Sequence, residues 1–314
     1  MTDMRKVAFL FAGQGAQTVG MGRDFADTVP ESGAVFSMGE ALRTGITQIC
    51  FGTGGQMDGA LLGQTANTQP CLFLTDLAIA EAFRAVGLLP AAVAGFSLGE
   101  IPAAAFAGVL SYEEAFRFVL LRAESMAWQS GRHPGGMAAA LKLAPEVVEE
   151  ICSRFSEVWP VNYNCPGQVS CAGSAAEIDD FCAAVRQAGG RAVKLPVSGA
   201  FHTPYMAQVA PVLRAALDGA DVSAPAIPLY ANRTASPYPA DRAGILDCMT
   251  LQVCSPVRWE STLRAMWTAG ITTFVEVGAG HTLTGFVSRT LPEARALTVN
   301  DIPSFEAVCR ELTE

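Results

Sequence analysis

The sequence predicts a mixed α/β fold in which a larger unit carries a small inserted domain. A short apolar run ends in Gly95-Phe96-Ser97-Leu98-Gly99, and an alanine-rich segment follows, which indicates a strand, a sharp turn and a helix. Residues 137–197 indicate the order strand, helix, strand, strand, helix, strand, which is typical of ferredoxin-like domains. The chain has 314 residues, half of them hydrophobic, enough for one large domain or two modest ones.

The composition of the chain argues against several classes of binding partner. The net charge is −9 and there is no basic block, which argues against nucleic acid. The nine cysteines show no metal-ligand spacing, so we expect no metal, and with no signal peptide in the sequence they indicate a reducing cytoplasm. The apolar run at 7–12 is too short to span a membrane, and charged residues interrupt the apolar region 70–96.

The first element expected is a buried strand over residues 6–11, followed by a glycine-rich turn at 12–17. A dinucleotide site is disfavoured because Thr18 occupies the place of the third glycine of that fingerprint. The turn can instead present main-chain N–H groups, or the Gln14 amide, to a reacting carbonyl. Residues 21–66 carry only weak helical patterns.

The remaining elements follow from apolar periodicity and from start and stop signals. Helices are expected at 71–86 and 101–110, and another from a capping box at Ser111 to about 129. The inserted domain should contain strands 137–143, 158–162, 168–172 and 191–197 and helices 145–155 and 175–188. A helix to about 217, a strand at 225–230, a helix opening at 251–259 and ending near 270, a strand at 272–277 and a partly helical tail after 292 should follow. We therefore divide the chain into a large unit of residues 1–131 and 198–314 and an insertion of residues 132–197.

Ser97 is the predicted nucleophile, because glycines on both sides let the strand and the helix pass close to the turn. A serine nucleophile needs a base that works near pH 7, and histidine is the usual choice. Of the three histidines, position alone favours His202, which lies in a loop before a helix at the edge of the insertion. His281, at a strand end, stays eligible, and His133 lies in the expected hinge.

No orienting acid is evident from the sequence. Glu276 and Asp247 lie near suitable loops without a distinctive signature, and a main-chain carbonyl could equally hold the imidazole, which would make a dyad. Arg122 lies among apolar residues of a helix. The pattern favours a side chain that extends to the surface, and the alternative is a buried site for an anion.

Several motifs together resemble the malonyl-CoA:acyl carrier protein transacylase family, which includes the acyltransferases of fatty acid synthesis and the free-standing, trans-acting acyltransferases of polyketide synthesis. The resemblance covers nearly the whole chain, in order. The matching segments are 11–17, Thr68-Gln69-Pro70, Gly95-Phe96-Ser97-Leu98-Gly99-Glu100, Arg122 with Met126, 135–139, 162–169, Phe201-His202, Gln252 with Pro256-Val257-Arg258-Trp259, and 275–278.

The resemblance implies an α/β-hydrolase-like large subdomain with an inserted ferredoxin-like subdomain. It also implies that Ser97 attacks the malonyl thioester, that His202 takes its proton, and that the main-chain carbonyl of Gln252 orients His202. The main-chain N–H groups of Gln14 and Leu98 would form the oxyanion hole.

For substrate binding, the resemblance implies that Arg122 binds the free malonyl carboxylate, which reverses the preference from the pattern for a surface arginine. It likewise implies that Met126, Phe201 and Asn162 contribute to substrate binding, and it makes His281 a less favoured base. Leu98 and Phe201 resemble malonyl-selective members, and a bulky Phe201 would crowd an α-methyl group.

The implied reaction is a ping-pong transfer from malonyl-CoA, a coenzyme A thioester, to the phosphopantetheine thiol of an acyl carrier protein, in fatty acid or polyketide synthesis. No cofactor is expected, and a monomer is. One alternative is an acyl hydrolase acting on carrier proteins, which should lack the arginine; the other is a non-catalytic docking module. Because carrier proteins are typically acidic like this chain, docking would need a local basic patch, for which Arg191, Lys194 and Arg289 are candidates.

The chain departs from the family pattern at three places. Phe96 replaces a usual histidine before the nucleophile, and Ile101-Pro102 replaces Tyr-Ala, so that the elbow helix is expected to start tight or to bend. Ala279 replaces a frequent proline. The first departure makes the expected pocket wall more apolar.

Overall fold

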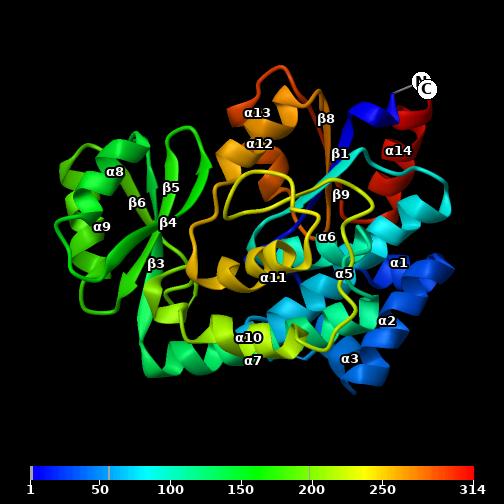
Figure 1. Cartoon of the computed structure of the whole chain (residues 1–314), viewed down its shortest axis with the longest axis horizontal. Coiled ribbons are helices and arrows are strands. Elements are labelled where there is room, and N and C mark those ends of the chain that lie inside the picture. Colours follow the sequence, from blue (N-terminus) through cyan, green and yellow to red (C-terminus); the bar gives the residue numbers. More distant parts are fainter. Residues whose placement is uncertain (1–2, 56, 198) are drawn as a thin grey trace.

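The computed structural model describes residues 3–55, 57–197 and 199–314, and two separate sheets organise them (Figure 1). The larger sheet is parallel with the order β7-β2-β1-β8-β9. Its strands are β1 Val7–Phe11, β2 Ala92–Gly95, β7 Leu229–Tyr230, β8 Thr273–Val277 and β9 Arg295–Val299. The central strands β1, β2 and β8 are apolar runs that are buried throughout, as expected where helices cover both faces of a parallel sheet.

The second sheet is antiparallel with the order β4-β5-β3-β6, and Figure 1 shows it apart from the first, at the left. Its strands are β3 Gly135–Leu141, β4 Val158–Cys165, β5 Gln168–Ser174 and β6 Arg191–Lys194. Two helices, α8 Pro145–Cys152 and α9 Ile178–Gln187, pack on it and enclose an apolar core of their own. Ser198, where we expected the large unit to resume, lies outside the described residues.

The other helices pack around the parallel sheet. They are α1 Arg23–Thr28, α2 Pro30–Leu42, α3 Ile46–Phe51, α4 Asp58–Leu62, α5 Thr65–Ala85, α6 Glu100–Phe106, α7 Tyr112–Arg132, α10 Val209–Leu217, α11 Arg242–Leu251, α12 Trp259–Thr268, α13 Thr282–Thr290 and α14 Ile302–Thr313. Short 3-10 turns occupy Met4–Lys6, Ser97–Gly99, Pro204–Met206 and Gln252–Cys254. The sequence did not predict α11, α13 or β9, and the helix expected to open within 251–259 begins at the last of these residues, Trp259.

Helix α5 begins six residues before the expected start at Cys71, so Pro70 lies inside it. A proline within a helix leaves the carbonyl four residues earlier without its N–H donor. Here that carbonyl belongs to Ala66, and Nη1 of Arg43 donates to it at 2.8 Å. The helix continues through Pro70 because a side chain from another segment supplies the missing hydrogen bond.

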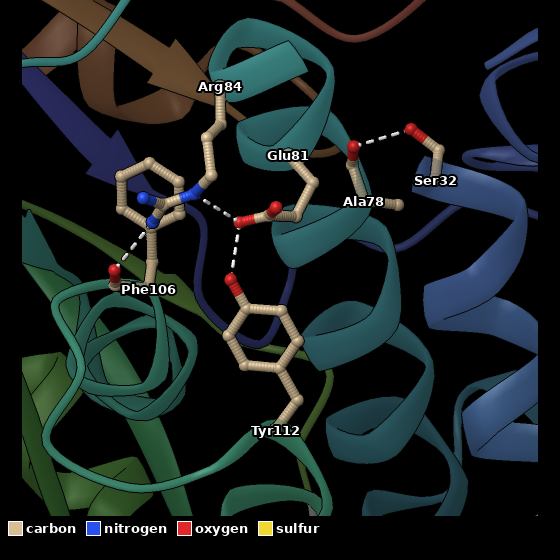
Figure 2. A network of polar contacts seen from close by, with 6 residues as sticks. All are labelled: Ser32, Ala78, Glu81, Arg84, Phe106 and Tyr112. Carbon is tan, nitrogen blue, oxygen red and sulfur yellow. Dashed lines mark hydrogen bonds and ion pairs between the residues drawn. The ribbon is translucent and has the colours of Figure 1, made fainter. Parts of the chain in front are cut away.

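A polar network anchors α5 to its neighbours (Figure 2). Glu81 accepts from Nε of Arg84 at 2.9 Å and from the hydroxyl of Tyr112, at the start of α7. Arg84 also lies over the ring of Phe106 and donates to its carbonyl at 2.8 Å, which ties the end of α6 to α5. Because α6 follows the sharp turn at Ser97, the network steadies the helix that leaves this turn.

Candidate active site

The turn at Ser97 connects β2 to a 3-10 turn and then to α6, at the carboxyl edge of the parallel sheet. A Cβ added to Gly95 would lie 1.9 Å from the carbonyl carbon of Gly99, and one added to Gly99 would lie 2.2 Å from the oxygen of Phe11. Only glycine permits this crossing. Ser97 itself has a φ of +53°, a strained value for a residue with a side chain.

Ser97 and His202 are in direct contact: Oγ lies 2.7 Å from Nε2. The other ring nitrogen, Nδ1, lies 3.0 Å from the carbonyl oxygen of Gln252 and 3.1 Å from that of Ser255. Because carbonyl oxygens only accept hydrogen bonds, Nδ1 carries the proton and Nε2 is free to accept from the serine hydroxyl. The geometry is that of a Ser-His dyad held by main-chain carbonyls.

The other candidates for base or orienting acid are engaged by other groups or are exposed, although Glu276 lines the same cavity as the dyad. His281 is exposed at the start of α13, and His133 is exposed and stacks on Tyr205. Glu276 accepts from the N–H groups of residues 283 and 284, and Asp247 pairs with a surface arginine. Neither acid is a partner of His202.

His202 is buried, and burial is the main cause that lowers the pKa of its imidazole, to about 4; the positive charge of Arg122 lowers it further. The two carbonyl acceptors act in the opposite direction. A base must be unprotonated before it acts, and this imidazole is neutral at pH 7.

The dyad opens into a cavity of about 220 Å³ between the two sheets. Its wall combines apolar side chains with a few polar ones and includes Gln14, Gln69, Phe96, Ser97, Met126, Met137, Asn162, Asn164, Gln168, Phe201, His202, Leu283 and Phe286. Six of the nine site residues that the resemblance implies therefore meet here: Gln14, Ser97, Met126, Asn162, Phe201 and His202. Such a cavity, apolar with a few convergent polar groups, is typical of a small-molecule site.

Two main-chain N–H groups expected at the oxyanion hole lie in turns beside Ser97. Leu98 is the second residue of a 3-10 turn, where an N–H has no acceptor within the helix. The N–H of Ser97 is already committed, because it donates to Oδ1 of Asn232 at 2.7 Å. Gln14 follows β1, and its side-chain amide donates to Thr65 at 3.2 Å.

Arg122 is completely buried, so the interpretation from the pattern alone, a side chain extending to the surface, is wrong. Nη1 donates to Oε1 of Gln69 at 2.6 Å and Nη2 donates to Oε1 of Gln252 at 2.9 Å, while Nε has no hydrogen-bond partner within the described residues. Burial lowers the pKa of Arg122 to about 10, which leaves it charged at neutral pH. Arg122 does not itself line the cavity; Gln69 and Met126, which do, lie beside it.

The sequence analysis missed a buried acid and an asparagine that support the turn. Glu100 accepts from the main-chain N–H of Asn232 at 2.9 Å, from Nε2 of Gln252 at 3.0 Å and from the hydroxyl of Tyr238. Burial raises the pKa of Glu100 to about 7, against these hydrogen bonds. Asn232 lies two residues beyond the expected strand 225–230, and a polar residue just after a parallel strand was the available signal.

Two departures from the family pattern have local explanations. Phe96 packs edge-on against Trp259, with ring centroids 5.4 Å apart, and forms part of the cavity wall. Pro102 is the third residue of α6, where its missing N–H would have had no acceptor within the helix. The helix does start tight, as a 3-10 turn over Ser97–Gly99.

In the part of the chain that the structure describes, no helix is both long and apolar enough to cross a membrane. Among the same residues, histidine, cysteine, aspartate and glutamate side chains form no group of three or more that could hold a metal ion.

A family model described as acyl transferase domain matches residues 8–310 of the chain. A malonyl CoA-acyl carrier protein transacylase of Bacillus subtilis is 33% identical over 317 residues, which cover 99% of this chain and 98% of that protein.

Solved structures of transacylases have the same fold as this chain. A malonyl CoA-acyl carrier protein transacylase from Clostridium perfringens superposes with a TM-score of 0.91 at 33% identity and covers 98% of this chain and 97% of its own. A second match, at 29% identity and a TM-score of 0.92 with 98% of this chain and 99% of that chain covered, comes from a complex of a type II PKS acyl-carrier protein with its malonyl-transacylase.

Proposed function

The chain belongs to the acyl transferase domain family, and from this membership we propose that it transfers a malonyl group from malonyl-CoA to the phosphopantetheine thiol of an acyl carrier protein. The observation that carries the proposal is the 2.7 Å contact between Ser97 and His202 at a cavity with the buried cation Arg122 beside it. A nucleophile, a base and a cation suited to a carboxylate are the groups that this reaction needs.

In the first half-reaction, Oγ of Ser97 attacks the thioester carbonyl carbon while Nε2 of His202 takes the hydroxyl proton. The N–H groups of Leu98 and Gln14 stabilise the negative charge on the carbonyl oxygen. When the carbon–sulfur bond breaks, His202 returns the proton to the departing thiolate and coenzyme A leaves. In the second half, the carrier thiol gives its proton to His202 and attacks the acyl-serine ester; the ester carbon–oxygen bond breaks and His202 returns the proton to Oγ, which regenerates Ser97.

Arg122 selects acyl groups that end in a carboxylate. Its guanidinium can hold a carboxylate with two parallel hydrogen bonds, which are stronger than its present bonds to neutral amides. Met126, Phe201 and Asn162 shape the space between Arg122 and Ser97. A malonyl group held at both ends is also placed where water attacks its ester poorly.

The finer description of the fold is part of the proposal. We assign residues 1–131 and 198–314 to an α/β-hydrolase-like subdomain and residues 132–197 to a ferredoxin-like one; the strand order β4-β5-β3-β6 supports the second assignment. No bound cofactor enters the scheme, since the acyl group arrives on coenzyme A and leaves on phosphopantetheine. One copy of the chain supplies every residue of the site, which favours a monomer, and the nine free cysteines suit the cytoplasm.

The experiment is an intact-mass measurement of the protein after exposure to an equal mixture of malonyl-, methylmalonyl- and acetyl-CoA. We expect a malonyl adduct that the Ser97→Ala variant does not form and that adding carrier protein removes. An adduct on Ser97→Ala would contradict the assignment of the nucleophile. Rapid loss of an acetyl adduct without carrier protein would instead support the hydrolase alternative.

A further inference from the structure

Side-chain amides hold the main chain of Ser97 at both its N–H and its C=O. The N–H of Ser97 donates to Oδ1 of Asn232 at 2.7 Å, and the C=O of Ser97 accepts from Nε2 of Gln252, also at 2.7 Å. Both amide side chains are buried. A residue with a side chain keeps a positive φ only where its surroundings impose it. These bonds therefore contribute to holding the nucleophile in its strained conformation.

Asn232 makes two further bonds that fix its own position. Its Nδ2 donates to the carbonyl of Gly95 at 2.6 Å, so one amide spans Gly95 and Ser97. Its main-chain N–H donates to Oε2 of Glu100 at 2.9 Å, and Nε2 of Gln252 donates to the same oxygen at 3.0 Å. One buried carboxyl oxygen thus connects the main chain of Asn232 to the side chain of Gln252.

Peptide planarity extends the effect to the next residue. In a trans peptide, the C=O of one residue and the N–H of the next point in opposite directions. Since Gln252 fixes the direction of the Ser97 carbonyl, it also fixes the direction of the N–H of Leu98. In the same way, the bond from Asn232 to the N–H of Ser97 fixes the peptide plane that precedes the nucleophile.

We propose that Asn232 is a positioning residue for acyl transfer: together with Gln252 it fixes the peptide planes on both sides of Ser97, so that Oγ faces His202 and the N–H of Leu98 faces the acyl oxygen. Asn232 touches no reacting atom and acts through the main chain of Ser97. The inference rests on the proposed function, because that function assigns the Leu98 N–H to the oxyanion.

The test measures single-turnover formation of the malonyl-enzyme by intact mass, which separates the rate constant from the fraction of protein that can be acylated. Asn232→Ser is too short to span Gly95 and Ser97, so we expect its rate constant at saturating malonyl-CoA to fall by about tenfold or more, with KM little changed. A rate constant equal to that of the wild type, or a loss of acylatable fraction alone, would overturn the proposal.

A second variant, Asn232→Asp, covers the case in which Asn232→Ser does not fold. A neutral carboxyl group can accept from Ser97 and donate to Gly95 as the amide does, whereas an ionised one cannot donate. We therefore expect the rate constant of Asn232→Asp, relative to the wild type, to be higher at pH 6 than at pH 8; a flat ratio would overturn the proposal.

Two controls isolate the effect. Ser32→Ala removes another buried side-chain bond to a main-chain carbonyl, the 2.6 Å bond to Ala78 (Figure 2), and should leave the rate constant unchanged. The wild type tests the proposed function separately. If it forms no malonyl adduct, the proposed function fails; if it does and the Asn232 variants match it, only this inference fails.

Discussion

Nη1 of Arg122 donates to Oε1 of Gln69 at 2.6 Å, and Gln69 lies between the guanidinium and the cavity that holds Ser97. A carboxylate that enters the cavity must therefore displace this amide oxygen to reach the cation. The exchange is favourable, because a buried bond between two charged partners is stronger than one to a neutral amide. Under the proposed function, Gln69 satisfies Arg122 until an acyl group with a carboxylate takes its place.

This arrangement predicts that Arg122→Gln loses malonyl transfer selectively. Hydrogen bonds to charged groups contribute about 1.5–3 kcal/mol each, so we expect kcat/KM for malonyl-CoA to fall by roughly 100-fold or more. Acylation by acetyl-CoA, which has no carboxylate, should change little. Arg117→Gln, at an exposed arginine on the same helix, is the matched control and should retain both activities. Equal losses for the two substrates would contradict the assigned role of Arg122.

The burial of His202 predicts an acid limb at unusually low pH. Its pKa is lowered from 6.5 to about 4, chiefly by burial, so the imidazole stays neutral and active as pH falls and is protonated only near the lower value. Single-turnover malonylation followed from pH 8 to pH 4 should therefore lose its rate constant with a midpoint nearer to 4 than to 6.5. A midpoint near 6.5 would indicate that water reaches the imidazole.

The sequence predicted correctly those helices and turns whose formation depends on residues close together in the chain. The capping box of Ser111 and Glu114 is present, and the turn at Ser97 forms because of the two glycines that surround it. Helix α13 was missed because its N-cap residue, His281, makes no capping bond; Glu276, on the preceding strand, accepts from the first N–H groups of the helix instead. Pro70 misled the prediction of where α5 begins because the compensating donor, Arg43, is distant in sequence.

Contacts between residues distant in the chain also limited the prediction of the candidate site. The burial of Arg122 depends on Gln69 and Gln252, which lie 53 and 130 residues away in the chain, and Ser97 depends on Asn232, 135 residues away. The spacing of apolar residues within one helix cannot indicate such distant contacts. The resemblance to a family corrected the prediction that Arg122 extends to the surface, because the family's motifs carry information about contacts between distant segments. Asn232 belongs to none of the matching motifs, and only the structure revealed its contact with Ser97.

Phe201 predicts the selectivity between malonyl and methylmalonyl groups. Its buried side chain lines the cavity next to His202, where a substituent on the acyl α-carbon would meet it. Phe201→Ser should make room and raise the share of methylmalonyl-enzyme formed from an equal mixture of the two thioesters. Because one methyl group is worth about 1–3 kcal/mol, we expect a shift of roughly 10-fold or more. An unchanged product ratio, with the total yield of acyl-enzyme retained, would show that a residue other than Phe201 excludes the α-methyl group.

Of the basic residues considered for docking of an acidic carrier protein, Arg289 is one that contacts the cavity wall. It is exposed on α13, and its Nη1 donates at 2.8 Å to Oε1 of Gln168, a residue of the cavity wall, whereas Lys194 is already paired with Asp179. Opposite charges at a rim act mainly on the rate of association and are screened by salt. Arg289→Glu should therefore raise KM for the carrier protein by about tenfold at low salt, and less at high salt, while malonylation by malonyl-CoA stays unchanged. Arg310→Glu makes the same charge change at an exposed position on α14 and should have no such effect. An equal rise in both variants would mean that net charge, rather than a patch beside the cavity, governs the encounter.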